Sequence, residues 1–255
     1  LRQSVEQGDF ELVYQPQIDL HTLEVVGVEA LLRSRNSLLM TMSTRALLAL
    51  AEEIGLMNDI GVWVMRAACI QLQRWREAGM PVFRLAVNVA ASQLLQPDFI
   101  DQLHDVLEST GLPASTMEIE INESALLIAR EAGSNVMSQL ESLGVSISID
   151  DFGAGLSTLS FLKEYPVDVL KLDSALIRNL PRDQEDSAIV SAIIRLAKDL
   201  NIKVVAEGVE TLEQLGFLRG TSCHLGQGYL FSEAVRPERF EQLVRNPQRQ
   251  GRIFH

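Results

Sequence analysis

The sequence predicts an α/β fold, a (β/α)8 TIM-like barrel with an antiparallel first strand pair. Short apolar segments typical of strands alternate with amphipathic helical segments, and this alternation is typical of a largely parallel sheet covered by helices. Eight such strand segments follow one another, and 255 residues is a usual length for a barrel that forms one domain. The first two strand segments are joined too tightly for a parallel crossover, so we expect them to pair antiparallel.

The strand and helix segments follow in a regular order along the chain. The link between the first two strands, residues 19–22, is too short to hold a helix. Strands are expected at residues 10–16, 24–32, 84–89, 117–121, 145–149, 167–172, 204–206 and 227–231. Helices are expected at residues 1–8, 45–56, 60–78, 99–109, 136–143, near 159, and at 188–200, 212–218 and 237–244.

The fifth strand segment ends in the most informative local sequence. Its β-branched residues run directly into Asp150 and Asp151, and a glycine-spaced turn follows. Two neighbouring carboxylates at the end of an apolar strand repel each other, and a divalent cation, which prefers oxygen ligands, removes that cost. Taken alone, the stretch also fits a solvated turn with a helix cap, because Asp and Gly are common turn residues.

Composition limits the possible partners. Hydrophobic residues make up 47% and charged residues 22%, and the formal net charge is -12. Such an acidic chain is not expected to bind nucleic-acid polymers or to dock on anionic membranes, both of which need basic patches. Bound divalent cations would offset part of the negative charge.

The chain shows no uncharged run of membrane-spanning length and no signal peptide. Two cysteines without zinc-type spacing favour a reduced, cytoplasmic compartment. We expect Cys69 in the core and Cys223, near a glycine-rich stretch, to be more exposed. Because the first residue is Leu1, we expect one domain, residues 1–255, excised from a longer multidomain protein with a sensor or a membrane anchor upstream.

Polar residues fall at nearly every strand end. In barrels of this kind the chemistry lies at the carboxyl ends of the strands, so these side chains are expected to share one rim. Any one of them is more often a residue that meets solvent, but their convergence is hard to explain by coincidence. The residues are Glu29, Asn88, Glu120, Glu123, Asp150, Asp151, Lys171, Asp173, Glu207, Glu210 and Gln227.

The donor types at this rim indicate a metal. Carboxylate and amide oxygens suit Mg²⁺ or Mn²⁺, and more of them are present than one small ion needs, so two ions are expected. Two ions are typical of phosphodiester hydrolysis. Lys171 could orient the attacking water, accept its proton if its pKa is depressed, or neutralise the phosphate; alternatively it forms an ion pair with Asp173 or Glu207. The histidines fit no zinc site or catalytic triad, and no phosphate-binding P-loop is present.

Eight motifs in order resemble the EAL-domain phosphodiesterases, which hydrolyse cyclic di-GMP in bacteria. The resemblance covers essentially the whole chain, and the motifs are specific only together. They are YQP at 14–16, EALLR at 29–33, NVAASQL at 88–94, EINES at 120–124, DDFGAGLSTL at 150–159, LKLD at 170–173, AEGVET at 206–211 and QGYLFS at 227–232.

The resemblance implies a role for each matching residue. Metal ligands would be Glu29, Asn88, Glu120, Asp150 and Asp151. Lys171, Glu207 and Glu29 would be catalytic, the first two through water activation, and Gln227 would position water or phosphate. Substrate would contact Gln15, Leu31, Arg33, Asp173 and Gln227, with Arg33 on a phosphate. Glu123 would anchor the loop that follows Asp151, which contributes to a homodimer.

The family reaction converts cyclic di-GMP to linear 5′-pGpG, and the expected upstream partner is a sensor or GGDEF-type domain. The loop at residues 34–43 departs from the family pattern, which usually has Trp and a His-Pro pair there. All metal ligands are kept, which favours an active enzyme over a receptor that binds cyclic di-GMP without cleaving it. An unrelated metal-dependent barrel enzyme would not explain why the motifs occur together.

Overall fold

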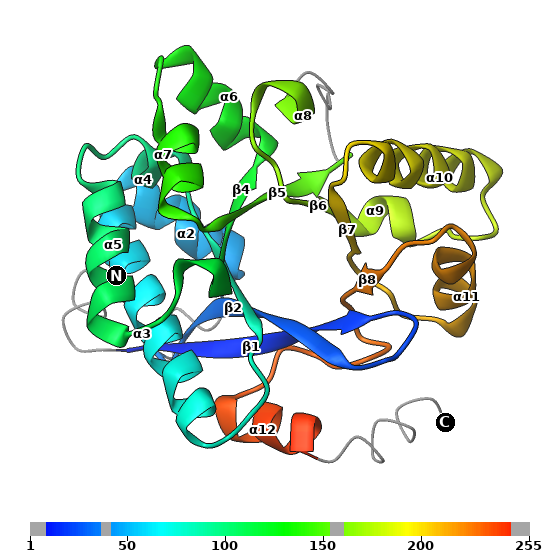
Figure 1. Ribbon diagram of the computed structural model, residues 1–255, viewed down its shortest axis with the longest axis horizontal. Coiled ribbons are helices and arrows are strands. Elements are labelled where there is room, and N and C mark those ends of the chain that lie inside the picture. The colour runs from blue at the N-terminus through cyan, green and yellow to red at the C-terminus, as the bar shows by residue number, and fades with distance from the viewer. Residues whose placement is uncertain (1–8, 37–41, 154–160, 246–255) are drawn as a thin grey trace.

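The strands form a closed barrel in which each strand lies beside the next one in sequence, and the last lies beside the first (Figure 1). The computed structural model describes residues 9–36, 42–153 and 161–245. The strands are β1 (Phe10–Asp19), β2 (Val25–Ser34), β3 (Arg84–Asn88), β4 (Met117–Asn122), β5 (Ser146–Phe152), β6 (Val169–Leu172), β7 (Lys203–Ala206) and β8 (Leu225–Gly226). The predicted barrel is therefore confirmed.

β1 runs against both of its neighbours, and every other pair in the barrel is parallel. The antiparallel first pair was predicted from its short link. In that link the Asp19 carboxylate accepts hydrogen bonds from the backbone N–H groups of His21 at 2.8 Å and Thr22 at 2.9 Å. This side-chain turn reverses the chain within a few residues, as Asp often does.

The helices cover the outside of the barrel (Figure 1). They are α2 (Thr44–Glu53), α3 (Met57–Glu77), α4 (Ala91–Leu94), α5 (Phe99–Thr110), η1 (Ala114–Thr116), α6 (Glu123–Glu131), α7 (Val136–Leu143), α8 (Phe161–Glu164), α9 (Ser174–Ile177), α10 (Gln184–Asp199), α11 (Leu212–Gly220) and α12 (Pro237–Arg245). The helix predicted at residues 1–8 lies outside the described residues, as does the centre of the one predicted near 159. Of the helices described, none has the length and apolar character needed to cross a membrane.

The two faces of the strands have different chemistry. On β4, Ile119 and Ile121 belong to the hydrophobic core between the sheet and the helices. Side chains alternate along a strand, so Glu118 and Glu120 face the barrel interior, and both are buried. The same alternation puts Lys171 of β6 inside. The barrel interior therefore carries charge above a small apolar layer, formed by Val169, Val205 and Leu225.

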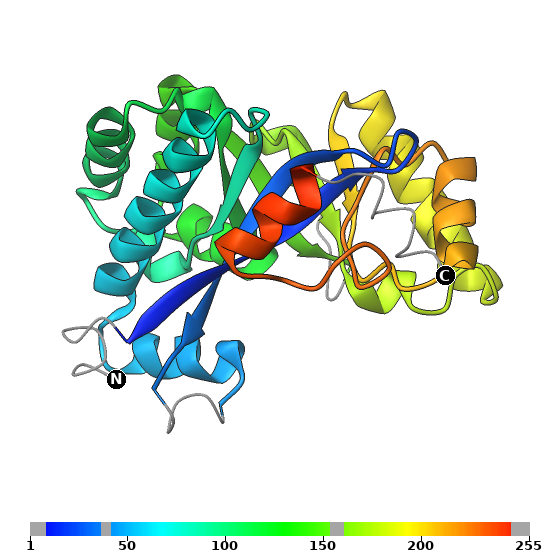
Figure 2. The same cartoon turned by 90° about the horizontal axis from the view of Figure 1, so that it is seen from below.

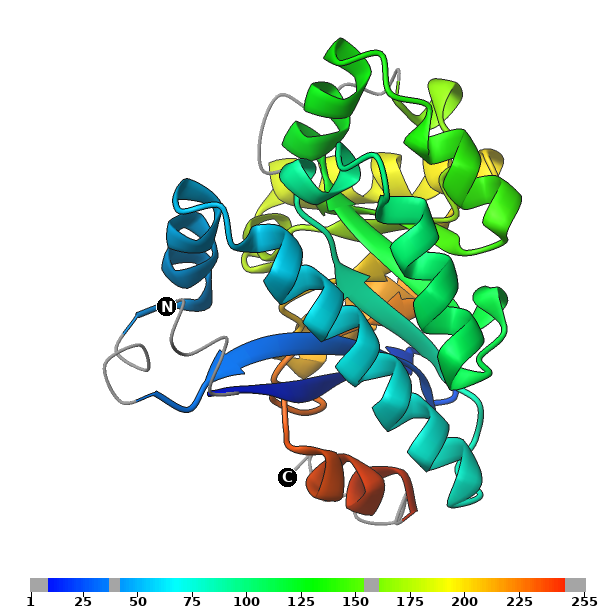
Figure 3. The ribbon, with the colours of Figure 1, turned by 90° about the vertical axis from the view of Figure 1, so that its left-hand side faces the viewer.

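The C-terminal helix α12 holds β1 from outside. Tyr14 of β1 packs edge-on against Trp75 of α3, with ring centroids 4.8 Å apart, and Trp75 packs on Phe240 of α12 at 4.6 Å. Figure 2 shows α12 lying across the β1–β2 pair, and Figure 3 shows it on the β1 side of that pair. Because Tyr14 points outward, the adjacent Gln15 is directed toward the barrel mouth.

Two sequence expectations are wrong in this part of the chain. Cys223 is fully buried rather than exposed, because it packs into the core under β8. The eighth strand was expected at residues 227–231, yet β8 comprises only Leu225–Gly226. Residues after Gln227 turn instead over the loop that follows β7, where the Leu230 N–H donates to the Val209 carbonyl at 3.0 Å.

Gly228 allows this turn, and its replacement by Ala should destabilise the protein. A Cβ at this position would collide with the backbone N and O of Val209, which cannot move aside as a flexible side chain does. Overpacking of this kind costs about 1–3 kcal/mol. Thermal unfolding should show a melting temperature lower by several degrees. Gly220→Ala is the control, because nothing lies within 4 Å of its Cβ; equal melting temperatures for the two variants would contradict the packing argument.

Candidate active site

Lys171 is the centre of a buried charge cluster at the carboxyl ends of the strands. Its side chain is 1% exposed, and one ammonium meets four carboxylates. Lys171 Nζ lies 2.8 Å from Glu207 Oε1, 2.9 Å from Glu120 Oε2, 3.1 Å from Asp150 Oδ1 and 3.4 Å from Glu29 Oε2. Side chains from β2, β4, β5, β6 and the end of β7 therefore converge as predicted from the strand ends.

Of the two ion pairs weighed for Lys171, the structure has the one with Glu207. The Asp173 carboxylate instead accepts a hydrogen bond from the Ala175 N–H at 2.6 Å and caps α9. Glu210, three residues after Glu207, is exposed. Only the first of these two glutamates reaches the cluster.

Amide side chains connect the cluster to β1 and β3. Asn88 Nδ2 donates to Glu29 Oε1 at 2.7 Å and to Glu120 Oε2 at 3.1 Å. Gln227 Nε2 donates to Glu29 Oε2 at 2.6 Å and to Gln15 Oε1 at 3.0 Å. Gln15 in turn donates to the Ser232 carbonyl at 3.2 Å. Asn88, Gln227 and Lys171 together fix Glu29 from three sides.

The pKa values of the buried carboxyl groups in the cluster shift in opposite directions, because burial raises all of them and local charges and hydrogen bonds oppose it to different extents. Burial, followed by the charge of Glu29, raises the pKa of Glu120 well above its ordinary value. Burial raises the pKa of Glu207 to about 8, although Lys171 opposes the shift. Burial acts on Glu29 as well, but Lys171 and the amide hydrogen bonds outweigh it and lower its pKa. The cluster thus holds more carboxyl groups than its one ammonium can pair with, and without a bound cation the raised pKa values favour the protonated forms of Glu120 and Glu207.

The pKa of Lys171 is raised well above its ordinary value. Burial alone would lower it, but the charges of Glu120, Glu207, Glu29 and Asp150 prevail. Among these carboxylates Lys171 is an ammonium that donates hydrogen bonds. Of the roles considered for it, orienting water and neutralising phosphate fit this environment, whereas proton acceptance through a depressed pKa does not.

A β-bulge brings Asp150 and Asp151 to the same rim. Neighbouring residues of a regular strand point to opposite faces, but the register of β5 against β6 shifts between Ile149 and Phe152. Asp151 adopts a left-handed backbone conformation with φ of 54°. The bulge re-aims the second carboxylate, so that oxygens of Asp150, Asp151 and Glu207 lie within 4.8 Å of one another. Burial and then the charge of Asp150 raise the pKa of Asp151 to about 6.

The cluster fits a divalent cation. Its donors are carboxylate and amide oxygens, which suit Mg²⁺ or Mn²⁺. Glu120 Oε1 is buried and has no hydrogen-bond partner among the described residues, a state that costs free energy unless a cation satisfies it. Ligation by Asn88 would require its Oδ1 to take the place of Nδ2, a half-turn of the amide.

Two of the predicted substrate-binding residues, Leu31 and Arg33, lie on the same strand as Glu29. Leu31 and Arg33 follow Glu29 at alternate positions of β2 and so share its face. Arg33 Nη1 donates to the Leu32 carbonyl at 2.8 Å and to Thr44 Oγ1 at 3.2 Å, which directs it toward α2. Glu123 begins α6 directly after β4. It is predicted to anchor the loop after Asp151, of which residues 154–157 lie outside the described residues, and this role stays a prediction.

Sequence reasoning missed a buried layer beneath the cluster. Glu118 is fully buried and forms an ion pair with Arg84 at 3.2 Å. Burial raises the pKa of Glu118, although Arg84 opposes the shift. The signal was present, because Glu118 lies two residues before Glu120 and must share its face.

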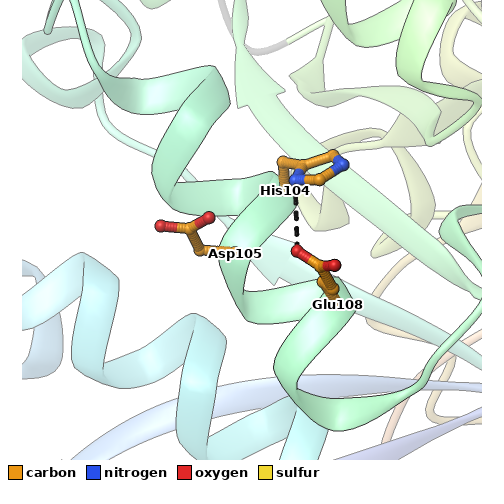
Figure 4. Close-up of side chains that lie close together, drawn as sticks. All are labelled: His104, Asp105 and Glu108. Carbon is orange, nitrogen blue, oxygen red and sulfur yellow. Dashed lines mark ion pairs between the residues drawn. The ribbon is translucent and has the colours of Figure 1, made fainter.

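A second group of potential metal ligands lies on the surface of α5. His104, Asp105 and Glu108 are all exposed. Figure 4 shows His104 and Glu108 one helical turn apart. His104 Nδ1 lies 4.0 Å from Glu108 Oε2, and one ligand atom of each of the three residues lies within 4.8 Å of the others. This arrangement is an ordinary solvent-exposed helix pair of small energetic value.

Comparisons with known proteins agree with the geometry. Cyclic di-GMP phosphodiesterase NbdA of Pseudomonas aeruginosa is 41% identical over 245 residues, which is 96% of this chain and 31% of NbdA. The bifunctional diguanylate cyclase/cyclic di-GMP phosphodiesterase MucR of the same organism is 39% identical over 244 residues, 96% of this chain and 35% of MucR. The chain thus spans about a third of these relatives.

Solved structures show the same architecture. The PaMucR phosphodiesterase in complex with c-di-GMP superposes with a TM-score of 0.87 at 38% identity, covering 94% of this chain and 97% of that one. The EAL domain of DcpA from Mycobacterium smegmatis gives a TM-score of 0.79 at 32% identity, with 94% and 97% covered. The EAL domain profile matches residues 1–234. The chain belongs to the EAL domain family.

Proposed function

We propose that this protein hydrolyses cyclic di-GMP to linear 5′-pGpG, using two Mg²⁺ or Mn²⁺ ions. The observation that carries the proposal is the cluster around Lys171, where four carboxylates share one ammonium within 3.4 Å. The names of its relatives support the substrate, because NbdA and MucR are both called cyclic di-GMP phosphodiesterases. The bacterial cytoplasm is the compartment in which we expect the protein to encounter this substrate.

The proposed ligands of the ions are Glu29, Asn88, Glu120, Asp150 and Asp151. Bound divalent cations would supply a nucleophilic water and stabilise charge on the phosphate. An oxygen of water attacks phosphorus, the bond to the ribose O3′ breaks, and O3′ takes up a proton. The product keeps a 5′-phosphate. Glu207 would accept the proton of the water, and Lys171, whose Nζ lies 2.8 Å from Glu207 Oε1, would orient that water as an ammonium.

The remaining side chains would hold the substrate. Gln227 and Gln15 already form a hydrogen-bonded pair beside Glu29. Arg33 is positioned to turn from Thr44 to a phosphate, and Leu31 would contact a base. Asp173 lies at the same rim, where its charge helps to raise the pKa of Asp151. A homodimer through the loop after Asp151, anchored by Glu123, and an upstream sensor or GGDEF-type domain complete the proposal.

One assay separates this enzyme from a receptor that only binds the dinucleotide. The changed loop at 34–43, whose residues 37–41 lie outside the described ones, is the feature that favours a receptor. The purified protein is incubated with cyclic di-GMP and Mn²⁺, and the products are separated by chromatography. Formation of pGpG is expected. Saturable binding with intact dinucleotide would select the receptor.

Asp151→Gly should separate the ligand role of Asp151 from its backbone conformation. Glycine accepts φ of 54° without strain, so the melting temperature should change little. Loss of the carboxylate should weaken Mn²⁺ binding by at least about tenfold, measured by calorimetry, since each oxygen ligand contributes to the site. Asn201→Gly makes the same backbone change at φ of 59° on the far side of the barrel. Unchanged Mn²⁺ affinity in Asp151→Gly would rule the residue out as a ligand.

A further inference from the structure

A cavity opens at the end of the barrel opposite the carboxylate cluster. Its volume is about 670 Å³. It is bordered by Arg84 and Lys203, which begin β3 and β7, and by His224, which directly precedes β8. Lys198 near the end of α10 completes one side. The cavity therefore lies at the amino-terminal mouth of the parallel strands, which the proposed hydrolysis does not use.

The charge of this mouth contrasts with that of the whole chain. The formal net charge is -12, and the sequence contains only four lysines, at 163, 171, 198 and 203. Lys171 belongs to the carboxylate cluster, and two of the other three line this cavity. With Arg84 and His224 they place four basic side chains around one opening. Electrostatic attraction for an anion is thus concentrated here.

These basic groups are only partly neutralised. Within the described ranges, neither Lys198 nor Lys203 forms an ion pair. Asp19 is the one acidic residue in the described lining, and its carboxylate is already engaged by the backbone N–H groups of His21 and Thr22. Arg84 is shared with the buried Glu118. Positive charge remains available to a ligand.

The deeper wall of the cavity is apolar. Val26 and Leu225 line it and also belong to the inner apolar layer of the barrel. Ile194, Ile202 and Val204 line it from the α10–β7 side. A ligand that fits both parts needs an anionic group at the mouth and an apolar body that reaches the barrel interior, because apolar surface is stabilised by leaving water.

We propose that this mouth binds a small organic anion, a phosphate monoester or carboxylate attached to an apolar ring or chain. The basic side chains contact the anionic group, and the apolar wall contacts the ring or chain. This site lies apart from the carboxylate cluster, whose excess negative charge repels free anions when no cation is bound. The proposal does not depend on the phosphodiesterase activity.

Phenyl phosphate is a suitable probe, titrated into the full chain without added divalent cation, so that no cation draws the probe to the carboxylate cluster, and followed by calorimetry. We expect one saturable site that Lys198→Glu/Lys203→Glu weakens at least tenfold. Lys163→Glu, an exposed lysine on α8, is the matched control and should bind as the wild type does. Melting temperatures establish that both variants are folded.

Three outcomes would overturn the proposal. The first is that the wild type shows no saturable binding. The second is that the double variant binds phenyl phosphate as well as the wild type does, which would place the probe at another site, such as the carboxylate cluster. The third is that inorganic phosphate binds as tightly as phenyl phosphate, which would show that the apolar wall does not contribute to binding. Tenfold weaker binding of inorganic phosphate is the expected result.

Discussion

Glu29→Gln should reduce hydrolysis of cyclic di-GMP by at least about a thousandfold while the protein stays folded. Glu29 is the most connected carboxylate of the cluster, bound by Lys171, Asn88 and Gln227. Glutamine keeps the size and an acceptor oxygen, so packing is preserved, but the charge that would hold a metal is lost. Turnover is measured by pGpG formation, and folding by the melting temperature.

Glu108→Gln is the matched control for this variant. Glu108 has a side chain that is 77% exposed on α5, and its loss of charge should leave turnover unchanged. A Glu29→Gln protein that still cleaves at the wild-type rate would contradict the assignment of Glu29 as a metal ligand and catalytic residue. A variant that fails to fold is recognised by its melting curve, and Asp150→Asn then serves as the second test of the same cluster.

Lys171→Met should destabilise the metal-free protein by about 3–5 kcal/mol, the usual cost of removing one partner from a buried ionic group. Without the ammonium, four carboxylates lie together with no cation among the described side chains near them. Mg²⁺ should restore part of the loss, because a cation at 100 times its Kd contributes about 2.7 kcal/mol. Urea unfolding with EDTA and with Mg²⁺ measures both effects.

Lys163→Met provides the comparison, because it removes an exposed lysine and should change stability by less than about 0.5 kcal/mol. Activity of Lys171→Met should be lost even with Mg²⁺ present, since no ammonium remains to stabilise the phosphate. Equal stability of Lys171→Met and the wild type in EDTA would show that the cluster is not strained by its excess negative charge.

Much of the site followed from one rule, because the carboxyl ends of parallel strands share a rim. Glu29, Glu120 and Lys171 were predicted to lie together on that basis. In the structure an oxygen of each glutamate lies within 3.4 Å of Lys171 Nζ. The rule could not explain how Asp150 and Asp151 both reach the rim. That depends on the register shift of β5 against β6, a tertiary feature without a clear local signal.

Errors occurred where tertiary contacts override local pattern. The apolar residues after Gln227 have strand-like sequence, yet they turn because Gly228 packs directly on the backbone of Val209. Cys223 has a polar and glycine-rich neighbourhood, yet the closing of β8 onto β1 buries it. A pattern within a short window of sequence cannot predict either contact.

Hydrolysis of cyclic di-GMP in H₂¹⁸O, with Mn²⁺ present and the product analysed by mass spectrometry, tests the central claim most directly. Attack of water on phosphorus with cleavage of the bond to O3′ predicts linear pGpG that carries one ¹⁸O atom in its 5′-phosphate. The label should be absent from the ribose hydroxyls. Intact cyclic di-GMP after prolonged incubation, or pGpG without the label in its terminal phosphate, would contradict the proposed reaction at the Lys171 cluster.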